Sequence, residues 1–254
     1  MIVRILLVND DGIQAEGIQA LVKVLSLKHD IIVAAPAREQ SGMAHAITVR
    51  KRIEVARYTE LENLYHAEAW KIDGTPADCV KLYLEAIAGN QKPDLIISGI
   101  NHGANLGTDV LYSGTVGAAI EGYLHHISSI AVSLDIDAAI TYEQTAKWFE
   151  TQLERLLDEQ LPVLFNINFP KSLQHDLPVF VYTCLGNRDY LNAFQRTVDE
   201  NGRVFYCMAG EIYDVDNGDA TDIYAVNQGL ISVTPLQTNL TNLVSLDHYL
   251  KKDA

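Results

Sequence analysis

Two adjacent carboxylates follow the first apolar run of the chain and are the residues whose position most strongly indicates chemistry. The run Ile5–Val8 has the length of a buried strand with apolar residues on both faces, and it leads to Asp10, Asp11 and Gly12. In an open α/β sheet, ligands bind beyond the carboxyl ends of the strands. Adjacent carboxylates also make each other harder to ionise, which a hard divalent cation would offset. These residues alone leave open the alternative of a polar turn or a helix cap.

Two polar loops follow other predicted strands and should meet the aspartates at the same edge of the sheet. The first contains Ser41 and Gly42, and the second contains Asn101 and Asn105. Together with the two aspartates, the hydroxyl of Ser41 and the amide oxygen of Asn101 would make a set of hard oxygen donors. Such a set suits Mg²⁺, Mn²⁺ or Ca²⁺ and does not suit a soft metal.

A predicted helix over 115–124 begins shortly after the second loop and offers a place for an anion. Its start is Ser113, Gly114 and Thr115, whose backbone N–H groups point along the helix axis. A hard cation beside a helix N-terminus is a site for phosphate, and hydrolysis is then the simplest chemistry. The alternative is that these residues, like Asn105, serve only as turn and helix-cap residues, and that Ser41 is an ordinary loop serine.

The rest of the first 185 residues alternates between strand and helix patterns. Apolar spacing predicts a helix over 15–25, a buried strand over 30–35 and a single helix over 142–156. Thr75 and Asp78 are predicted to cap another helix. This alternation indicates an α/β fold, a Rossmann-like doubly wound sheet that is mostly parallel.

The chain changes character after about residue 185, and three segments are predicted. Residues 1–185 form the catalytic core, and 186–228, which are polar, turn-rich and aromatic, form an extended β-hairpin arm. Residues 229–254 form a strand and a helix that return to the core or exchange with a partner subunit. Arms of this kind often serve oligomerisation.

Composition excludes several classes of protein. The 254 residues are 48% hydrophobic and carry a formal net charge of −14, which argues against a surface for a nucleic-acid polymer. No apolar run is long enough to cross a membrane, and we expect a cytoplasmic protein. Cys79, Cys184 and Cys207 have no metal-type spacing, and we predict buried free thiols. The dinucleotide fingerprint, the P-loop, the nucleophile elbow of esterases and the His-Glu-x-x-His zinc motif are all missing.

Five ordered motifs stand out along the chain: Val8-Asn-Asp-Asp-Gly-Ile13, Ala35-Pro-Ala-Arg-Glu-Gln-Ser-Gly42, Asp73-Gly-Thr-Pro-Ala-Asp-Cys79, Ser98-Gly-Ile-Asn-His-Gly-Ala-Asn105 and Tyr112-Ser-Gly-Thr-Val-Gly-Ala-Ala119. They resemble the motifs of the SurE family, the stationary-phase survival proteins, which are metal-dependent 5′/3′-nucleotidases. The resemblance implies a Rossmann-like core with an exchanged C-terminal hairpin, assembled as a homodimer or homotetramer. It also implies hydrolysis of nucleoside monophosphates and, in some members, of short polyphosphate.

The resemblance also implies a role for each site residue. The family's metal ligands map onto Asp10, Asp11, Ser41 and Asn101, which would hold one divalent ion, Mg²⁺ or Mn²⁺, per subunit. One of the two aspartates would orient or deprotonate the attacking water, and the Asn101 amide would donate to phosphate. The further phosphate contacts are predicted at Ser41, Gly42, Asn105, Ser113, Gly114 and Thr115.

Two other functions remain open from the sequence. An aspartyl-nucleophile phosphatase of the haloacid-dehalogenase type requires Asp-x-Asp after the first strand, whereas this chain has Asp10, Asp11 and Gly12. A non-catalytic nucleotide-binding module would bind nucleotides without releasing phosphate.

Overall fold

A nine-stranded, mostly parallel sheet forms the centre of the computed structural model, which describes residues 2–157, 162–214 and 218–252. All neighbouring strands in this sheet are parallel except the β3–β4 pair and the β7–β13 pair, which are antiparallel. The order is β3 (Val55–Arg57), β4 (Glu68–Ile72), β2 (Asp30–Pro36), β1 (Arg4–Val8), β5 (Leu95–His102), β6 (Ser128–Leu134), β7 (Leu164–Phe169), β13 (Ile231–Pro235) and β8 (Phe180–Tyr182). The predicted α/β class and mostly parallel sheet are confirmed.

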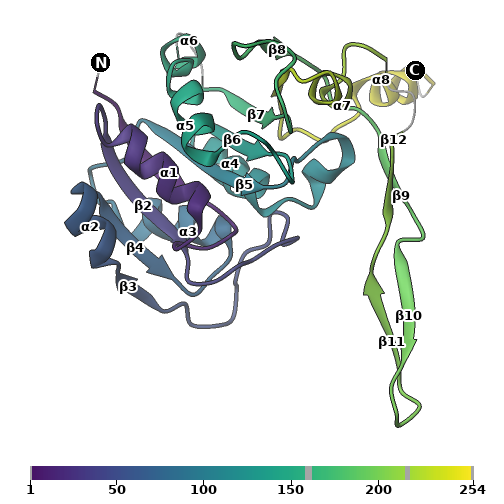
Figure 1. Cartoon of the computed structure of the whole chain (residues 1–254), viewed down its shortest axis with the longest axis horizontal. Helices are drawn as coiled ribbons and strands as arrows, with labels where there is room; N and C mark the ends of the chain where they lie inside the picture. The colour runs from purple at the N-terminus through teal and green to yellow at the C-terminus, as the bar shows by residue number, and fades with distance from the viewer. Residues whose placement is uncertain (1, 158–161, 215–217, 253–254) are drawn as a thin grey trace.

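Helices cover both faces of this sheet, as Figure 1 shows. One face carries α1 (Glu16–Leu25) and α5 (Tyr142–Glu150), and the other carries α3 (Pro76–Leu82) and α4 (Gly114–Leu124). Strand β1 supplies both layers, because alternate side chains point to opposite faces. Ile5 and Leu7 pack in the first layer and Leu6 and Val8 in the second. The apolar run before Asp10 is therefore buried on both sides, as its composition predicts.

The shorter helices contain two corrections to the sequence analysis. The single helix predicted over 142–156 is broken into α5 and α6 (Leu153–Leu157), with a turn at 151–152 between them. A helix, α7 (Asp222–Asn227), also lies inside the range predicted as hairpin arm, and its Ile223 and Val226 are buried against Leu106. The remaining elements are α2 (Thr59–Tyr65), a π-helical turn η1 (Tyr83–Ile87), a 3-10 turn η2 (Gly107–Leu111) and α8 (Leu243–Lys252).

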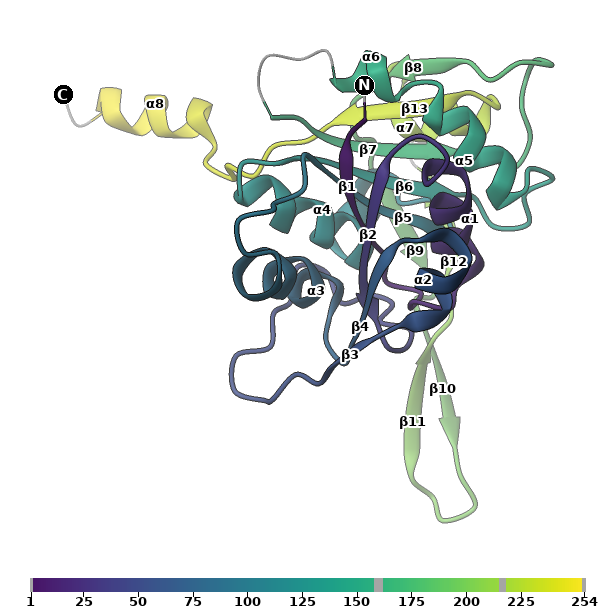
Figure 2. The same cartoon turned by 90° about the vertical axis from the view of Figure 1, so that its left-hand side faces the viewer.

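A long two-stranded arm extends away from the sheet, as seen in Figures 1 and 2. It is built from β9 (Arg188–Leu191), β10 (Phe194–Val198), β11 (Val204–Met208) and β12 (Glu211–Asp214), with β10 pairing β11 and β9 pairing β12 antiparallel. Every residue of β10 and β11 is exposed. Helix α8 also buries no residue and projects from the body in Figure 2. The predicted arm, 186–228, includes residues 215–217, which lie outside the described part of the chain.

The cysteines partly contradict their prediction. Cys79 is buried and its thiol is free, but Cys184 and Cys207 are exposed. The difference follows from position, since Cys79 lies in α3 against the sheet while Cys207 lies on the exposed arm. Over the described residues, no helix combines the length and hydropathy needed to cross a membrane.

Candidate active site

Strand order places the two aspartates at the switch point of the sheet. The chain runs from β1 to β2 on one side and later returns to β5 on the other side of β1. Such a reversal opens a crevice at the carboxyl ends of the two central strands, where ligands bind in this class of fold. Asp10 and Asp11 follow the end of β1, and Asn101 and His102 close β5 beside it. The structure therefore brings two of the predicted loops to one point.

Asp10 lies directly against the start of helix α4. Its side chain is 5% exposed, and it accepts a hydrogen bond from the Thr115 hydroxyl. A Cβ added at Gly114 would lie 3.0 Å from the Asp10 Cβ and 3.1 Å from Oδ2, so a larger residue would push Asp10 and the helix apart by a few tenths of an ångström. Ser113 is the N-cap, its Oγ accepting from the Val116 N–H at 3.1 Å. The positive end of the α4 dipole therefore faces a carboxylate.

Burial makes both aspartates resist ionisation. It raises the pKa of Asp10 from 3.8 to about 6, although the Thr115 bond opposes the shift and the charge of Asp11 adds to it. Burial also raises the pKa of Asp11, opposed by the His102 N–H, which donates to Asp11 Oδ2 at 3.2 Å. Within the described part of the chain, no lysine or arginine contributes to either shift. Over the described residues the pair is thus a partly buried anionic site that no lysine or arginine balances, and His102 is the basic side chain whose charge lowers the pKa of Asp11.

Asn101 is held by an irregularity in β5. The register with β6 shifts by one residue between Ser98 and Asn101, which marks a β-bulge. The Asn101 Nδ2 donates to the Gly103 carbonyl at 2.6 Å, which fixes the orientation of the amide and leaves Oδ1 as its acceptor atom. The half-buried Asn101 therefore presents an oxygen at the end of the strand beside β1.

The loop that carries Ser41 and Gly42 crosses the same edge. The Gln40 N–H donates to the Asp10 carbonyl at 2.7 Å, so Ser41 is one residue from a direct contact with the strand end. Its hydroxyl, however, donates to Glu39 Oε1 at 2.7 Å and is exposed. Gly42 has a φ of +70° and open space around it. A metal contact by Ser41 and a phosphate contact by Gly42 stay predictions.

Asn105 lies in a buried polar cluster below this edge. Its Nδ2 donates to Ser133 Oγ at 2.9 Å, and its backbone N–H donates to Asn168 Oδ1 at 2.8 Å. Its carbonyl accepts from Asn166 and Asn168. These bonds hold the 103–107 segment against β6 and β7. The predicted phosphate contact of Asn105 is not tested by this geometry, in which the amide nitrogen already has a protein partner.

The sequence analysis missed a carboxylate that holds the Ser41 loop in place. Glu121 of α4 accepts from His45 Nε2 at 2.8 Å, lies 3.2 Å from Lys81 Nζ and 3.3 Å from His125 Nε2, and is 5% exposed. The bond with His45, and then the one with Lys81, lower its pKa to about 2 against the effect of burial. The only signal in the sequence is a single acidic residue among small and apolar ones in the predicted helix.

The capping prediction for Thr75 and Asp78 is confirmed, and the structure adds a second contact. The two residues form a reciprocal capping box at the start of α3. Asp78 also accepts from the N–H and the hydroxyl of Thr48, and Thr75 donates to the Ala46 carbonyl. The α3 cap therefore anchors the far end of the Ser41 loop, whose start is anchored by Asp10.

The donors at this edge fit a hard cation. Over the described residues, no three His, Cys, Asp or Glu side chains group as a metal site. The predicted set instead has two carboxylates, one amide oxygen and one hydroxyl, all oxygen donors, and Mg²⁺ commonly takes only one or two protein carboxylates and fills its shell with water and phosphate. The unbalanced charge of Asp10 and Asp11 is the feature that a cation would relieve.

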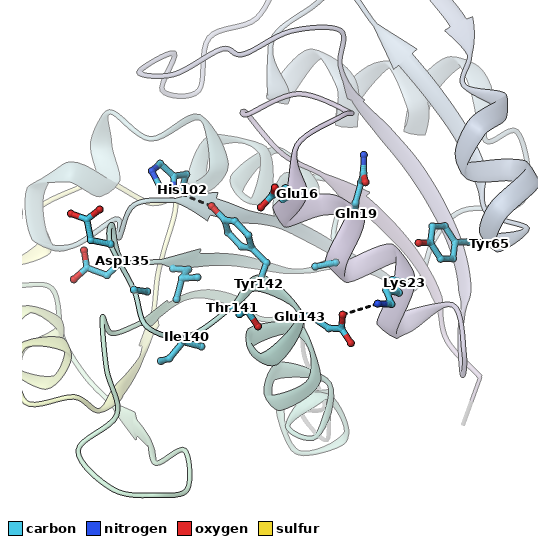
Figure 3. Close-up of a pocket in the computed structure, with 14 residues that line it drawn as sticks. Glu16, Gln19, Lys23, Tyr65, His102, Asp135, Ile140, Thr141, Tyr142 and Glu143 are labelled. Atoms are coloured by element: carbon cyan, nitrogen blue, oxygen red, sulfur yellow. Dashed lines mark hydrogen bonds and ion pairs between the residues drawn. The ribbon is translucent and has the colours of Figure 1, made fainter.

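A pocket of about 540 Å³ is lined in part by His102, whose backbone N–H donates to Asp11, and Figure 3 shows the lining residues. His102 links the two, since its backbone bonds to Asp11 and its Nδ1 lies 3.0 Å from the Tyr142 hydroxyl, a pair drawn with a dashed line in Figure 3. The walls come from α1, the start of α5, the 135–141 loop and Tyr65 of α2. His102 is thus the residue that both contacts the anionic strand end and lines this pocket.

Known proteins resemble this chain over nearly its whole length. The family model "Survival protein SurE" matches residues 5–192. A protein of Pelotomaculum thermopropionicum named 5′-nucleotidase SurE is 47% identical over 244 residues, covering 94% of this chain and 91% of its own. One of Heliobacterium modesticaldum with the same name is 45% identical, covering 94% of this chain and 88% of its own. The crystal structure of the SurE protein from Aquifex aeolicus is 36% identical and superposes with a TM-score of 0.82, covering 98% of this chain and 99% of that one.

Proposed function

The chain belongs to the SurE survival protein family, and from this premise we propose that it is a phosphohydrolase that removes phosphate from nucleoside monophosphates. The relatives named 5′-nucleotidase support hydrolysis of a nucleotide phosphate ester. One observation carries the proposal for this chain: two adjacent carboxylates, the buried Asp10 and the half-buried Asp11, lie at the switch point of the sheet with no described lysine or arginine acting on them, and Asp10 faces the N-terminus of α4. Dependence on one Mg²⁺ or Mn²⁺ per subunit is part of the same proposal.

We assign one group of residues to binding the cation and another to binding the phosphate. Asp10, Asp11, Asn101 Oδ1 and the Ser41 hydroxyl would hold the cation. A bound divalent ion supplies positive charge that polarises a phosphoryl group and makes a nearby water easier to deprotonate. Asp11 is the more exposed of the two aspartates and is therefore the better placed to orient the attacking water.

Helix α4 would receive the phosphate. Its first turn offers the Gly114 N–H, and the dipole favours an anion there. The Thr115 hydroxyl and backbone N–H both donate to Asp10 and keep that carboxylate in place, so the Gly114 N–H is the backbone group proposed for a phosphate oxygen. Gly42, with open space around it, would add a backbone contact from the opposite loop.

The test is phosphate release from a panel of nucleoside 5′- and 3′-monophosphates and short polyphosphate, in EDTA, Mg²⁺ or Mn²⁺. We expect release only with metal, and a loss of about 10²-fold or more in Asp11→Asn. Asp176→Asn, a change at an exposed aspartate in the loop after β7, three strands away from β1 in the sheet, should retain full turnover. Nucleotide binding without release by the folded protein under any metal would contradict the proposal and favour a binding module, and a trapped phospho-aspartate would favour an aspartyl nucleophile.

We also propose that the arm assembles the chain into a homodimer or homotetramer. In support, β10 and β11 are fully exposed yet carry large apolar side chains such as Phe194, Phe205 and Met208. Exposed apolar surface of this extent marks an interaction site. Light scattering after gel filtration should give a dimer or tetramer mass, and a monomer mass at micromolar concentration would contradict it. A cytoplasmic location stays a prediction.

A further inference from the structure

The pocket beside Asp11 has the size and wall structure of a small-molecule site. Its volume of about 540 Å³ falls in the range of roughly 300–1,000 Å³ that is usual for ligand pockets. Four separate segments build it, and Figure 3 shows side chains from α1 and from the 135–143 region turned toward a shared space. None of the phosphate-handling residues proposed above lines it, so the phosphohydrolase mechanism leaves it without a role.

His102 joins this pocket to the reaction centre. The Gly103 N–H donates to the Leu134 carbonyl at 2.8 Å, which holds the end of β5 against the loop that forms one wall. The hydroxyl of the half-buried Tyr142 lies 3.0 Å from His102 Nδ1, and the His102 backbone N–H donates to Asp11; the pKa of Tyr142 is raised by burial and then by the charges of Asp11 and Glu16. A phosphate ester held at Asp11 would therefore extend its other half over His102 into the pocket.

The pocket walls are acidic and aromatic. Carboxylates come from Glu16, Asp135 and Asp137, and a further one, Glu143, is paired with Lys23 at 2.6 Å. Among the described lining residues, Lys23 is the single lysine or arginine, so its charge is already balanced. The rings of Tyr65 and Tyr142 complete the walls, which favour a neutral ligand with hydroxyl or amino donors and a flat ring, and repel an anion.

We propose that this pocket binds the nucleoside part of the substrate while the phosphate lies at Asp10 and Asp11. The proposal rests on the function proposed above and adds the position and the selectivity of substrate binding. Ribose hydroxyls donate to the wall carboxylates, and the base packs against a tyrosine ring. An anionic chain in place of the nucleoside meets three unpaired carboxylates, so short polyphosphate is a poorer substrate than a nucleoside monophosphate.

The experiment compares two esters in a variant whose pocket is filled. Gln19 lines the pocket from α1 and is half-buried, and Gln19→Trp would occupy the space without touching the catalytic groups. We expect the KM for adenosine 5′-monophosphate to rise by about tenfold or more, with kcat/KM for glycerol phosphate within about twofold of the parent. Gln91→Trp is the matched control, because Gln91 is exposed and bonds to Arg4 at the opposite end of β1.

A second measurement is independent of turnover. Adenosine binding in EDTA, followed by calorimetry, should be detectable in the parent and weakened about tenfold in Gln19→Trp. If that variant does not fold, Asp137→Asn replaces it, since asparagine tolerates the φ of +56° at this position and removes one acceptor charge. Asp137→Asn should likewise raise the KM for adenosine 5′-monophosphate and leave that for glycerol phosphate unchanged.

The outcomes separate the pocket from the activity. Equal losses for both esters, or an unchanged KM for the nucleotide in both variants, would overturn the pocket proposal while the phosphohydrolase stands. A parent that hydrolyses no ester would remove the proposed function, and adenosine binding would still decide the pocket. The pocket proposal would also be overturned if adenosine binding were undetectable in the parent, or equal in the parent and the variants.

Discussion

The two ends of helix α4 hold buried carboxylates in opposite electrostatic states. At the N-terminus, Asp10 has a pKa raised to about 6, and in the third turn, Glu121 has one lowered to about 2. Both are 5% exposed, so burial alone does not decide the outcome. The difference lies in the neighbouring groups. His45, Lys81 and His125 surround Glu121, whereas the neighbours of Asp10 are the Thr115 hydroxyl and the Asp11 carboxylate.

This contrast separates a carboxylate that stabilises the fold from one that is available for a cation. The ion pairs at Glu121 tie the Ser41 loop and α3 to α4, and they satisfy its charge within the protein. Asp10 keeps an unbalanced charge, which costs stability until a cation binds. Stabilising contacts therefore lie one helix length away from the groups that must remain unpaired for chemistry.

The largest effect is expected from Asp10→Asn. Asparagine still accepts the Thr115 hydrogen bond but cannot hold a cation as a carboxylate does, so phosphate release should fall by about 10²-fold or more. The free energy of unfolding in EDTA at pH 7 should rise by about 1–3 kcal/mol, because the folded pKa of about 6 exceeds the ordinary 3.8 and ionised Asp10 destabilises the fold.

Urea unfolding in EDTA at several pH values measures this stability difference. The advantage of the variant should shrink as the pH falls from about 6 to 3.8, where Asp10 becomes protonated in both states. A variant less stable than the parent at pH 7 would mean that Asp10 serves the fold rather than the cation, and would erase the contrast between the two ends of α4.

Next comes Glu121→Gln, which is expected to lower the free energy of unfolding, the opposite of the change expected for Asp10→Asn. The folded pKa of about 2 lies below the ordinary 4.5, so ionised Glu121 stabilises the fold above pH 4.5, and this contribution is lost as the pH falls toward 2. At pH 7 the variant should lose about 1–3 kcal/mol of unfolding free energy. Chemical denaturation between pH 3 and 8 measures it, with the exposed Glu200→Gln as control. Equal stability of variant and parent at pH 7 would contradict the role of this cluster.

The smallest effect is expected from Lys81→Met, which tests which partner of Glu121 matters. Lys81 is 40% exposed and shares its charge between Glu121 and Glu85, so its removal should cost less than about 1 kcal/mol. Thermal unfolding at low and moderate salt would measure the change. A loss as large as that of Glu121→Gln would show that Lys81, and not His45, balances the buried carboxylate.

Several features of the site followed from local patterns that tertiary structure did not alter. A run that is apolar on both faces can be satisfied only in a covered sheet, so Ile5–Val8 had to be an internal strand with Asp10 and Asp11 at its end. Thr75 and Asp78 cap α3 because the bonds involved span only three residues. The glycines and small residues of 113–119 marked the helix that approaches the aspartates.

Other features depended on contacts between distant segments. Nothing local distinguishes Asn105, whose partners Ser133, Asn166 and Asn168 come from two other strands. The helix predicted over 142–156 fails for a related reason, because apolar periodicity continues across the break between α5 and α6. Periodicity reports which face is buried, and it does not report where the backbone turns.

By itself, the sequence determined the fold class, the family and the strand that ends in the aspartates. These depend on patterns of neighbouring residues, which follow from backbone geometry and the need to bury apolar surface. The tertiary structure alone decided that Glu121 is paired while Asp10 is not, and that a pocket opens beside Asp11. Ionisation depends on distances in space, and His45 and Lys81 reach Glu121 from distant positions that no local pattern relates, whereas His125 lies only four residues along the chain.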